Sequence, residues 1–121
     1  MPISKILIVD DTASQLEAFK NSMPPTSARI LTASSGKAAI DIAKSELPDI
    51  IFMDIVMDDV DGYAACRAIR DDTTTKDIPL IFVSTKNQRV DQMWAERQGG
   101  KALISKPIST EQIQEQLNIY G

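Results

Sequence analysis

Five polar residues with chemically active side chains lie at or just after the ends of short apolar runs in the sequence: Asp10, Asp11, Asp54, Ser84 and Lys106. Two like charges about 4 Å apart repel by about 4 kcal/mol at the effective dielectric near a protein surface. Three carboxylates brought together therefore need a counter-charge that Lys106 alone cannot supply. Mg²⁺ binds one or two carboxylates and completes its shell with water and phosphate oxygen. Because carboxylates also accept phosphoryl groups, these residues predict phosphoryl transfer to an aspartate with Mg²⁺, or alternatively Mn²⁺, as the cation.

The apolar runs in front of these residues are typical of β-strands buried on both faces of a parallel sheet. They span residues 6–9, 50–53, 80–83 and 102–104. A weaker fifth candidate, residues 29–32, has the mixed polarity of an edge strand.

Five further segments carry apolar residues at helical spacing. Their marker residues in chain order are Leu16, Phe19 and Met23; Ala39, Ile42, Ala43 and Leu47; Tyr63, Cys66 and Ile69; Val90, Met93, Trp94 and Arg97; and Ile113, Leu117 and Tyr120. Pro24-Pro25 and Gly99-Gly100 are expected to end the first and fourth helices, and Ser109 with Gln112 to cap the fifth. The sequence thus predicts an α/β fold of the (βα)₅ type, a doubly wound five-stranded parallel sheet. Ligands of such sheets bind outside the carboxyl ends of the strands.

Composition excludes several classes of protein. A chain of 121 residues with 43% hydrophobic residues predicts one domain, residues 1–121, with one core and no output domain. A net charge of -4 argues against direct nucleic-acid binding, and no apolar stretch reaches the length of a membrane span. Without histidine, the chain has no histidine-dependent triad and no phosphohistidine of its own. The single Cys66 forms no intramolecular disulfide, so we expect a cytoplasmic protein.

These residues, at this spacing, resemble the receiver domain of bacterial two-component response regulators over essentially the whole chain. The motifs that carry the resemblance are Asp10-Asp11, Met53-Asp54-Ile55-Val56-Met57, Ser84 and Lys106-Pro107. The resemblance implies a flavodoxin-like fold with strand order 2-1-3-4-5. It also implies a signalling protein that is not an enzyme in the ordinary sense, although it takes up and loses its own phosphoryl group.

The resemblance implies that Asp54 is the phosphoacceptor for a sensor histidine kinase, a histidine phosphotransfer domain or a small phosphodonor. Asp11 and Asp54 would bind Mg²⁺ directly, the backbone carbonyl of Val56 would be the third protein ligand, and Asp10 would bind through water. An Asp-Asp pair in front of a helix is also a common helix cap, a role that neighbouring hydroxyl residues could share.

The resemblance further implies that Lys106 pairs with the phosphoryl group, that Ser84 moves towards it, and that the peptide bond before Pro107 is cis. Two positions depart from the family. Asp58 replaces a common proline, which adds negative charge near the site. Leu103 replaces the usual tyrosine or phenylalanine, so the coupled movement of a hydroxyl and an aromatic ring is not expected here. Asp58 and its acidic neighbours predict a solvated loop rather than a second metal site.

Val56 and Lys86 are expected to flank the route by which water attacks the phosphoryl group. Because Val56 cannot orient water by hydrogen bonding, we predict slow self-dephosphorylation, which Lys86 could offset by drawing water in. Val56 also argues against an aspartyl phosphatase, since such enzymes generally need a second aspartate at this position. A phosphate sink that drains a kinase without an effector is the other alternative.

The expected output surface consists of four residues: Trp94, Met93, Leu103 and Tyr120. Trp94 is read either as core packing or as part of this surface. We expect the output surface to bind a downstream effector protein. We expect the chain to be a monomer or a weak phosphorylation-dependent dimer. A shorter resemblance, carried by Ser84-Thr85-Lys86, Trp94 and Arg97-Gln98-Gly99-Gly100, points to stand-alone receivers of type IV pilus twitching-motility and phototaxis systems.

Overall fold

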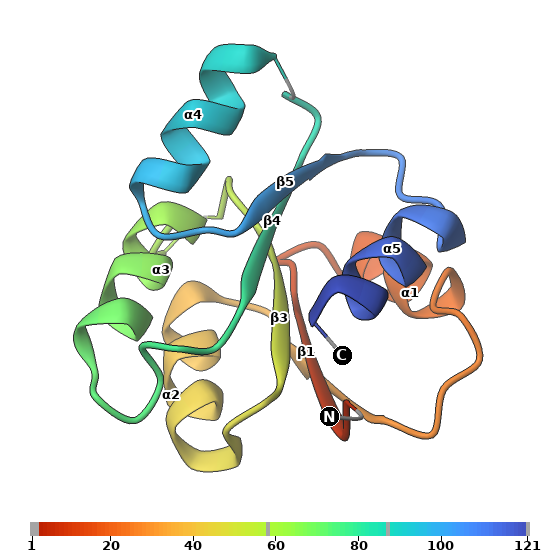
Figure 1. Cartoon of the computed structure of the whole chain (residues 1–121), viewed down its shortest axis with the longest axis horizontal. Coiled ribbons are helices and arrows are strands. Elements are labelled where there is room, and N and C mark those ends of the chain that lie inside the picture. The colour runs from red at the N-terminus through yellow and green to blue at the C-terminus, as the bar shows by residue number, and fades with distance from the viewer. Residues whose placement is uncertain (1–2, 58, 87, 121) are drawn as a thin grey trace.

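The fold is a parallel sheet with helices on both faces, as seen in a computed structural model that describes residues 3–57, 59–86 and 88–120 (Figure 1). The strands are β1 (Lys5–Val9), β2 (Arg29–Ala33), β3 (Ile50–Asp54), β4 (Leu80–Ser84) and β5 (Ala102–Ser105). The helices are α1 (Ala13–Asn21), α2 (Gly36–Glu46), α3 (Gly62–Asp71), α4 (Arg89–Arg97) and α5 (Thr110–Tyr120). The strand order is β2-β1-β3-β4-β5, with every neighbouring pair parallel, which confirms the predicted fold.

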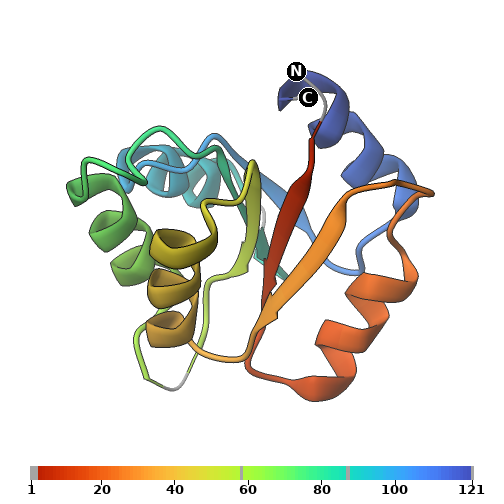
Figure 2. The same cartoon turned by 90° about the horizontal axis from the view of Figure 1, so that it is seen from below.

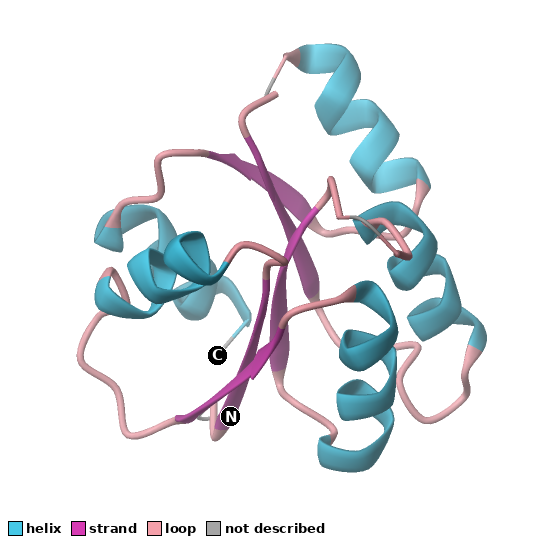
Figure 3. Ribbon diagram, turned by 180° about the vertical axis from the view of Figure 1, so that it is seen from behind, coloured by secondary structure: helices cyan, strands magenta, loops and turns pink. Residues whose placement is uncertain are grey.

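The three central strands have no polar alternation because both of their faces are covered. In β1, Ile6 and Ile8 point to one core cluster, and Leu7 and Val9 point to the other. The first cluster also holds Phe19 of α1, and α1 and α5 lie together on that face (Figure 2). Helices α2, α3 and α4 lie on the opposite face, and Figure 3, which shows the molecule from behind, has the strands between the two groups of helices. Strands between two helical layers are expected to be apolar throughout.

Strand β2 confirms the edge strand expected from its mixed polarity. It pairs only with β1 in the sheet, and its residues are mostly partly buried or exposed, with only Ala33 buried. Strand β5 forms the other edge, between α4 and α5 (Figure 1). None of the helices in the described residues is long and apolar enough to cross a membrane.

Helix ends differ from the sequence expectation in small ways. Met23 lies beyond α1, which ends at Asn21 ahead of the two prolines. Leu47 caps the end of α2 in a left-handed conformation with φ 49°. The capping box of α5 is confirmed, since Ser109 N donates to Gln112 Oε1 at 2.9 Å and Gln112 N donates to Ser109 Oγ at 3.2 Å.

Candidate functional site

The predicted site residues gather at the carboxyl edge of the sheet. Asp10 follows β1 and Lys106 follows β5, whereas Asp54 and Ser84 are the last residues of β3 and β4 rather than the first residues after them. The parallel register carries these ends to one edge, where Ser84 is paired with Ser105 of the neighbouring strand. Residues from four strands are therefore brought together by the sheet alone.

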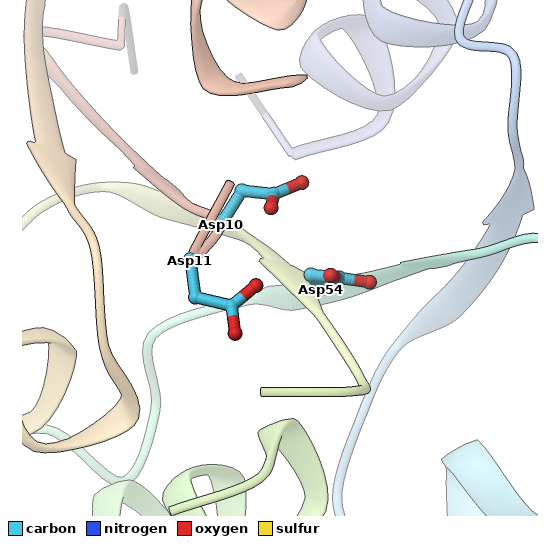
Figure 4. Close-up of side chains that lie close together, drawn as sticks. All are labelled: Asp10, Asp11 and Asp54. Atoms are coloured by element: carbon cyan, nitrogen blue, oxygen red, sulfur yellow. The ribbon is translucent and has the colours of Figure 1, made fainter. Parts of the chain in front are cut away.

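Three carboxylates converge at this edge (Figure 4). Asp10, Asp11 and Asp54 each offer one oxygen, and these oxygens lie within 4.8 Å of one another. Asp10 is buried, with 6% of its surface exposed, and the Asp54 side chain is 12% exposed. Hard oxygen donors at this spacing fit a small divalent cation such as Mg²⁺ or Mn²⁺.

The helix-cap alternative for the Asp-Asp pair accounts for only part of its contacts. Asp10 Oδ1 accepts a hydrogen bond from Thr12 N at 2.9 Å, just before α1. Thr12 is the N-terminal cap of α1, but its side chain makes no capping hydrogen bond. Instead, the Thr12 hydroxyl donates to Asp11 Oδ1 at 3.5 Å. The two carboxylates organise the start of α1 and still present oxygens to Asp54.

Lys106 supplies the positive charge of the site. Its Nζ lies 3.2 Å from Asp10 Oδ2 and 3.4 Å from Asp54 Oδ1, and its side chain is only 18% exposed. The peptide bond between Lys106 and Pro107 is cis, as the family resemblance implies. One ammonium group therefore bridges two of the three carboxylates.

Burial raises the pKa of Asp54 above its ordinary value of 3.8. The positive charge of Lys106 opposes this shift, and the negative charge of Asp10 adds to it. Without a bound cation, the positive charge of Lys106 is therefore too small to offset the cost of ionising Asp54. A cation bound beside it would favour the ionised, nucleophilic form.

Ser84 ends β4, which lies between β3, the strand that ends at Asp54, and β5, the strand that precedes Lys106. Its side chain is buried, and its Oγ accepts a hydrogen bond from Lys86 N at 3.0 Å. Its backbone carbonyl accepts a hydrogen bond from Lys106 N at 2.9 Å, which joins the end of β4 to the start of the loop that follows β5. The position suits a hydroxyl that donates to a group carried on Asp54.

The loop after β3 is held tightly at both ends. Ile55 N donates to Asp54 Oδ1 at 2.9 Å, and Gly62 N donates to Ile55 O at 2.7 Å. A Cβ on Gly62 would lie 2.3 Å from the carbonyl oxygen of Asp54, so α3 begins directly against the end of β3. Between these points Met57 is buried, whereas Val56 is 76% exposed. The side chain of Val56, two residues after Asp54, is therefore exposed to solvent.

The acidic loop does more than the solvated role expected from its sequence. Asp59 accepts from the first two backbone N–H groups of α2, at 3.1 and 3.2 Å. A hydrogen bond from the backbone of Val60 is the main cause that lowers the pKa of Asp59, and the two bonds from α2 add to it. Asp61 caps α3 by accepting from Ala64 N at 2.8 Å. The third acidic residue, Asp58, lies outside the described residues. Two exposed carboxylates of this loop are thus helix caps.

Comparison with known proteins agrees with this arrangement. Residues 6–118 match the response regulator receiver domain family. The chain belongs to this family. Receiver domains are signalling proteins that work with histidine kinases and effectors.

The receiver domain has relatives that differ in length. It is 34% identical over 116 residues to protein PilH of Pseudomonas aeruginosa, an alignment that covers 96% of each chain. It is 31% identical over 105 residues to the response regulator PleD of Caulobacter vibrioides, covering 87% of this chain and 23% of PleD. Among solved structures, the receiver domain of a sensor histidine kinase from Pseudomonas aeruginosa superposes with a TM-score of 0.87 at 23% identity, covering 97% of this chain and 96% of that one. That structure has a magnesium ion coordinated in its active site cleft.

The four residues of the expected output surface take different positions in the receiver domain. Met93 and Trp94 are 61% and 49% exposed on α4, and the guanidinium of Arg97 lies 5.8 Å from the centre of the Trp94 ring. Trp94 is therefore a surface residue and not core. Leu103 and Tyr120 are partly buried, packed against opposite core clusters of the sheet. Met93 and Trp94 are therefore exposed on α4, whereas Leu103 and Tyr120 are only partly exposed.

One contact residue of the receiver site has no counterpart in the sequence prediction. Gln15 of α1 accepts a hydrogen bond from Lys106 Nζ through its amide oxygen. Gln15, Asp10 and Lys106 also line a pocket of about 400 Å³ between α1 and the loop after β5, together with Phe19 and Pro107. Gln15 lies in the first turn of α1, and only the packing of α1 beside the loop after β5 places its amide at Lys106.

Proposed function

We propose that this receiver domain is a phosphorylation-dependent switch, in which Asp54 accepts a phosphoryl group from phosphohistidine. The donor is a sensor histidine kinase or a histidine phosphotransfer domain. One observation carries the proposal: Lys106 Nζ lies 3.4 Å from Asp54 Oδ1, beside three carboxylates whose oxygens lie within 4.8 Å of one another. Aspartyl phosphorylation needs three groups: a carboxylate nucleophile, a positively charged side chain held beside it, and oxygen ligands for a divalent cation.

In the proposed reaction, a carboxylate oxygen of Asp54 attacks the phosphorus of the donor. The new O–P bond forms as the N–P bond of phosphohistidine breaks, and the electron pair of that bond returns to the imidazole ring. Lys106 stabilises the charge on the phosphoryl oxygens, and the Ser84 hydroxyl donates to one of them. These groups act by position and charge rather than by forming further covalent bonds.

The metal ligands we propose are Asp11, Asp54 and the backbone carbonyl of Val56, with Asp10 bound through water. The convergence of three carboxylates supports this assignment. Mg²⁺, or alternatively Mn²⁺, would neutralise the charge of the phosphoryl oxygens during transfer. The protein's own contribution is to hold the ligands at the ends of β1 and β3.

For the output, we propose that phosphorylation shifts the population of conformations of α4, β5 and α5 and so regulates an effector protein. The exposed apolar side chains of Met93 and Trp94 support α4 as the contact surface. A chemical-shift perturbation map of phosphorylated against unphosphorylated protein tests this, because changes confined to the site would contradict it. Sedimentation of the same two samples distinguishes a monomer from a phosphorylation-dependent dimer.

We further propose that the domain acts as a stand-alone switch in the cytoplasm, with a role in motility. The similarity to PilH, which covers 96% of that protein, supports a receiver of this kind. The motility role rests on the short resemblance around Trp94 and the Gly99-Gly100 pair. Deletion of the gene, followed by a surface-motility assay and complementation with wild type or Asp54→Asn, tests that role directly.

The central experiment is incubation with Mg²⁺ and a small phosphodonor, followed by intact-mass measurement. We expect one phosphoryl adduct on the wild type, none after chelation of Mg²⁺, and none on Asp54→Asn. Asp41→Asn, which changes an exposed carboxylate on α2, is the matched control and should form the adduct as the wild type does. An adduct that persists on Asp54→Asn would contradict the proposal. Rapid adduct turnover without any phosphorylation-dependent partner would favour the phosphate sink.

A further inference from the structure

The ammonium group of Lys106 is held from three sides. Asp10 Oδ2 and Asp54 Oδ1 lie 3.2 and 3.4 Å from Nζ, and the amide oxygen of Gln15 accepts a hydrogen bond from the same nitrogen. A lysine ammonium has three N–H donors and no acceptor. Each donor therefore has one oxygen partner, and the third partner is a residue to which the proposed reaction gives no role.

Gln15 reaches Lys106 from the outer side of the site. It is an exposed residue in the first turn of α1, and it lines the pocket of about 400 Å³ that opens beside Asp10 and Lys106. The Lys106 side chain is itself only 18% exposed. The amide of Gln15 thus lies on the side of the ammonium that is not occupied by carboxylates.

The chemistry of an amide suits this position. A fourth carboxylate would add repulsion to a site that already holds three negative charges. An apolar side chain would leave one ammonium N–H without this protein acceptor. A neutral amide oxygen binds the third donor and leaves the charge of the site unchanged.

We propose that Gln15 is a positioning residue that holds the Lys106 ammonium over Asp54. Lysine has a long flexible side chain that loses rotamer freedom when it is fixed. The contact from α1 restricts that freedom before the phosphoryl group arrives, so the charge is already in place during transfer. This inference rests on the proposed phosphorylation of Asp54.

The test compares Gln15→Met and Gln15→Leu with Gln114→Leu. Both Gln15 variants remove the acceptor; methionine keeps the length of the side chain, and leucine shortens it by one atom. Gln114 is an exposed glutamine of α5 whose Nε2 donates a hydrogen bond to Asn118 Oδ1 at 2.9 Å, and it is the matched control. We expect the Gln15 variants to be phosphorylated by a small phosphodonor roughly three- to ten-fold more slowly, the usual range for loss of one ordinary hydrogen bond. Gln114→Leu should match the wild type.

Two further readouts separate positioning from a general structural role. In a Lys106→Met background, Gln15→Leu should cause no further loss of rate, because its effect passes through Lys106. In NMR spectra of the unphosphorylated protein, the ¹⁵Nζ signal of Lys106 should shift or broaden in Gln15→Leu and stay unchanged in Gln114→Leu.

The possible failures can be told apart. Wild-type protein that forms no adduct on Asp54 would overturn the proposed function and this inference with it. An adduct that forms at the wild-type rate in both Gln15 variants would overturn the role of Gln15 alone. If Gln15→Leu lowers the rate equally in the wild-type and Lys106→Met backgrounds, the role of Gln15 is also overturned, because its effect would not pass through Lys106.

Discussion

At the scale of single residues, the site holds opposite charges close together, and burial strengthens the electrostatic interactions between them. Asp54 is ionised with difficulty because it is buried and lies near Asp10, and Lys106 offsets only part of that cost. The same imbalance gives the site its use, since a group of carboxylates short of positive charge attracts a cation. Function and local instability thus have one physical cause.

Asp54→Asn should stabilise the metal-free protein at neutral pH. The folded-state pKa of Asp54 is raised, so its ionised form costs stability above that pKa, and a neutral amide removes this cost. We expect the free energy of unfolding at pH 7 to rise by roughly 1 kcal/mol. The gain should shrink as the pH falls through the raised pKa towards the ordinary value of 3.8, because the wild-type carboxyl then becomes neutral as well.

Urea denaturation with a metal chelator, at pH 7 and at pH 4, measures this difference. Asp41→Asn, on the exposed side of α2, is the control and should show no gain at either pH. A gain for Asp54→Asn that grows as the pH falls would contradict the assignment.

Val56→Asn should shorten the lifetime of the phosphorylated state. Val56 is 76% exposed beside Asp54 and offers no side-chain hydrogen bond to an attacking water. An amide at this position can orient that water, so we expect loss of the phosphoryl group to become roughly three- to ten-fold faster. The decay of the adduct after removal of the phosphodonor, followed by intact mass, gives the rate. Val56→Thr tests whether a smaller polar group gives part of the effect, and an unchanged lifetime in both variants would refute the role of Val56.

At the scale of elements, the loop after β3 is placed by two close backbone approaches. A Cβ on Gly36 would lie 2.0 Å from Val60 O, and one on Gly62 would lie 2.3 Å from Asp54 O. Asp59 adds hydrogen bonds from the loop to the start of α2. The loop that carries the proposed Val56 carbonyl ligand is therefore fixed between α2 and α3.

Gly62→Ala should disturb the site as well as the fold. The new Cβ meets backbone atoms of Asp54 and Ile55, which cannot move without displacing the end of β3. We expect a loss of roughly 1 to 3 kcal/mol in the free energy of unfolding, together with slower phosphorylation. Ala64→Gly in the same helix should cost up to about 1 kcal/mol through helix propensity alone. It should leave the phosphorylation rate unchanged, so equal rates for both variants would rule out the steric argument.

At the scale of the whole molecule, ligand binding and folding are linked because the site exists only when four strand ends are assembled. Asp10 and Asp54 are held by the neighbouring strands β1 and β3, and Lys106 follows the edge strand β5. A cation bound to this assembly stabilises the native state and leaves the unfolded chain unaffected.

Mg²⁺ should therefore raise the stability of the whole domain. At 100 times its dissociation constant, a ligand specific for the native state adds about 2.7 kcal/mol. We expect a higher thermal midpoint in Mg²⁺ than in chelator, with most of the difference lost in Asp11→Asn. Scanning calorimetry of the wild type, Asp11→Asn and Asp41→Asn measures it. A shift of the same size in all three proteins would show that Mg²⁺ acts elsewhere.

The fold could be predicted from the sequence because its strands are buried on both faces. Such strands need continuous apolar runs, and the polar residues at the ends of these runs mark the site. Asp10, Asp54, Ser84 and Lys106 were all identified in this way. The edge strand β2 was also identified, although its pattern was weaker.

The contacts between side chains from distant parts of the chain could not be predicted. Leu103 and Tyr120 were expected at the output surface, but each packs partly against the core. Asp59 caps a helix that begins 23 residues earlier in the chain, which no local pattern indicates. The direction of a side chain depends on how the helices pack on the sheet, and that packing is a property of the assembled layers.

The sequence by itself determined the order of strands and helices along the chain and the polar residues that follow each strand, because hydrophobic period is a local property of the chain. Only the tertiary structure decided which of those residues touch and what else touches them. Gln15 and Lys106 are 91 residues apart and meet because α1 packs beside the loop that follows β5. The residue types along the chain determine which chemistry the site can perform, whereas the packing of helices against the sheet determines the geometry of the site.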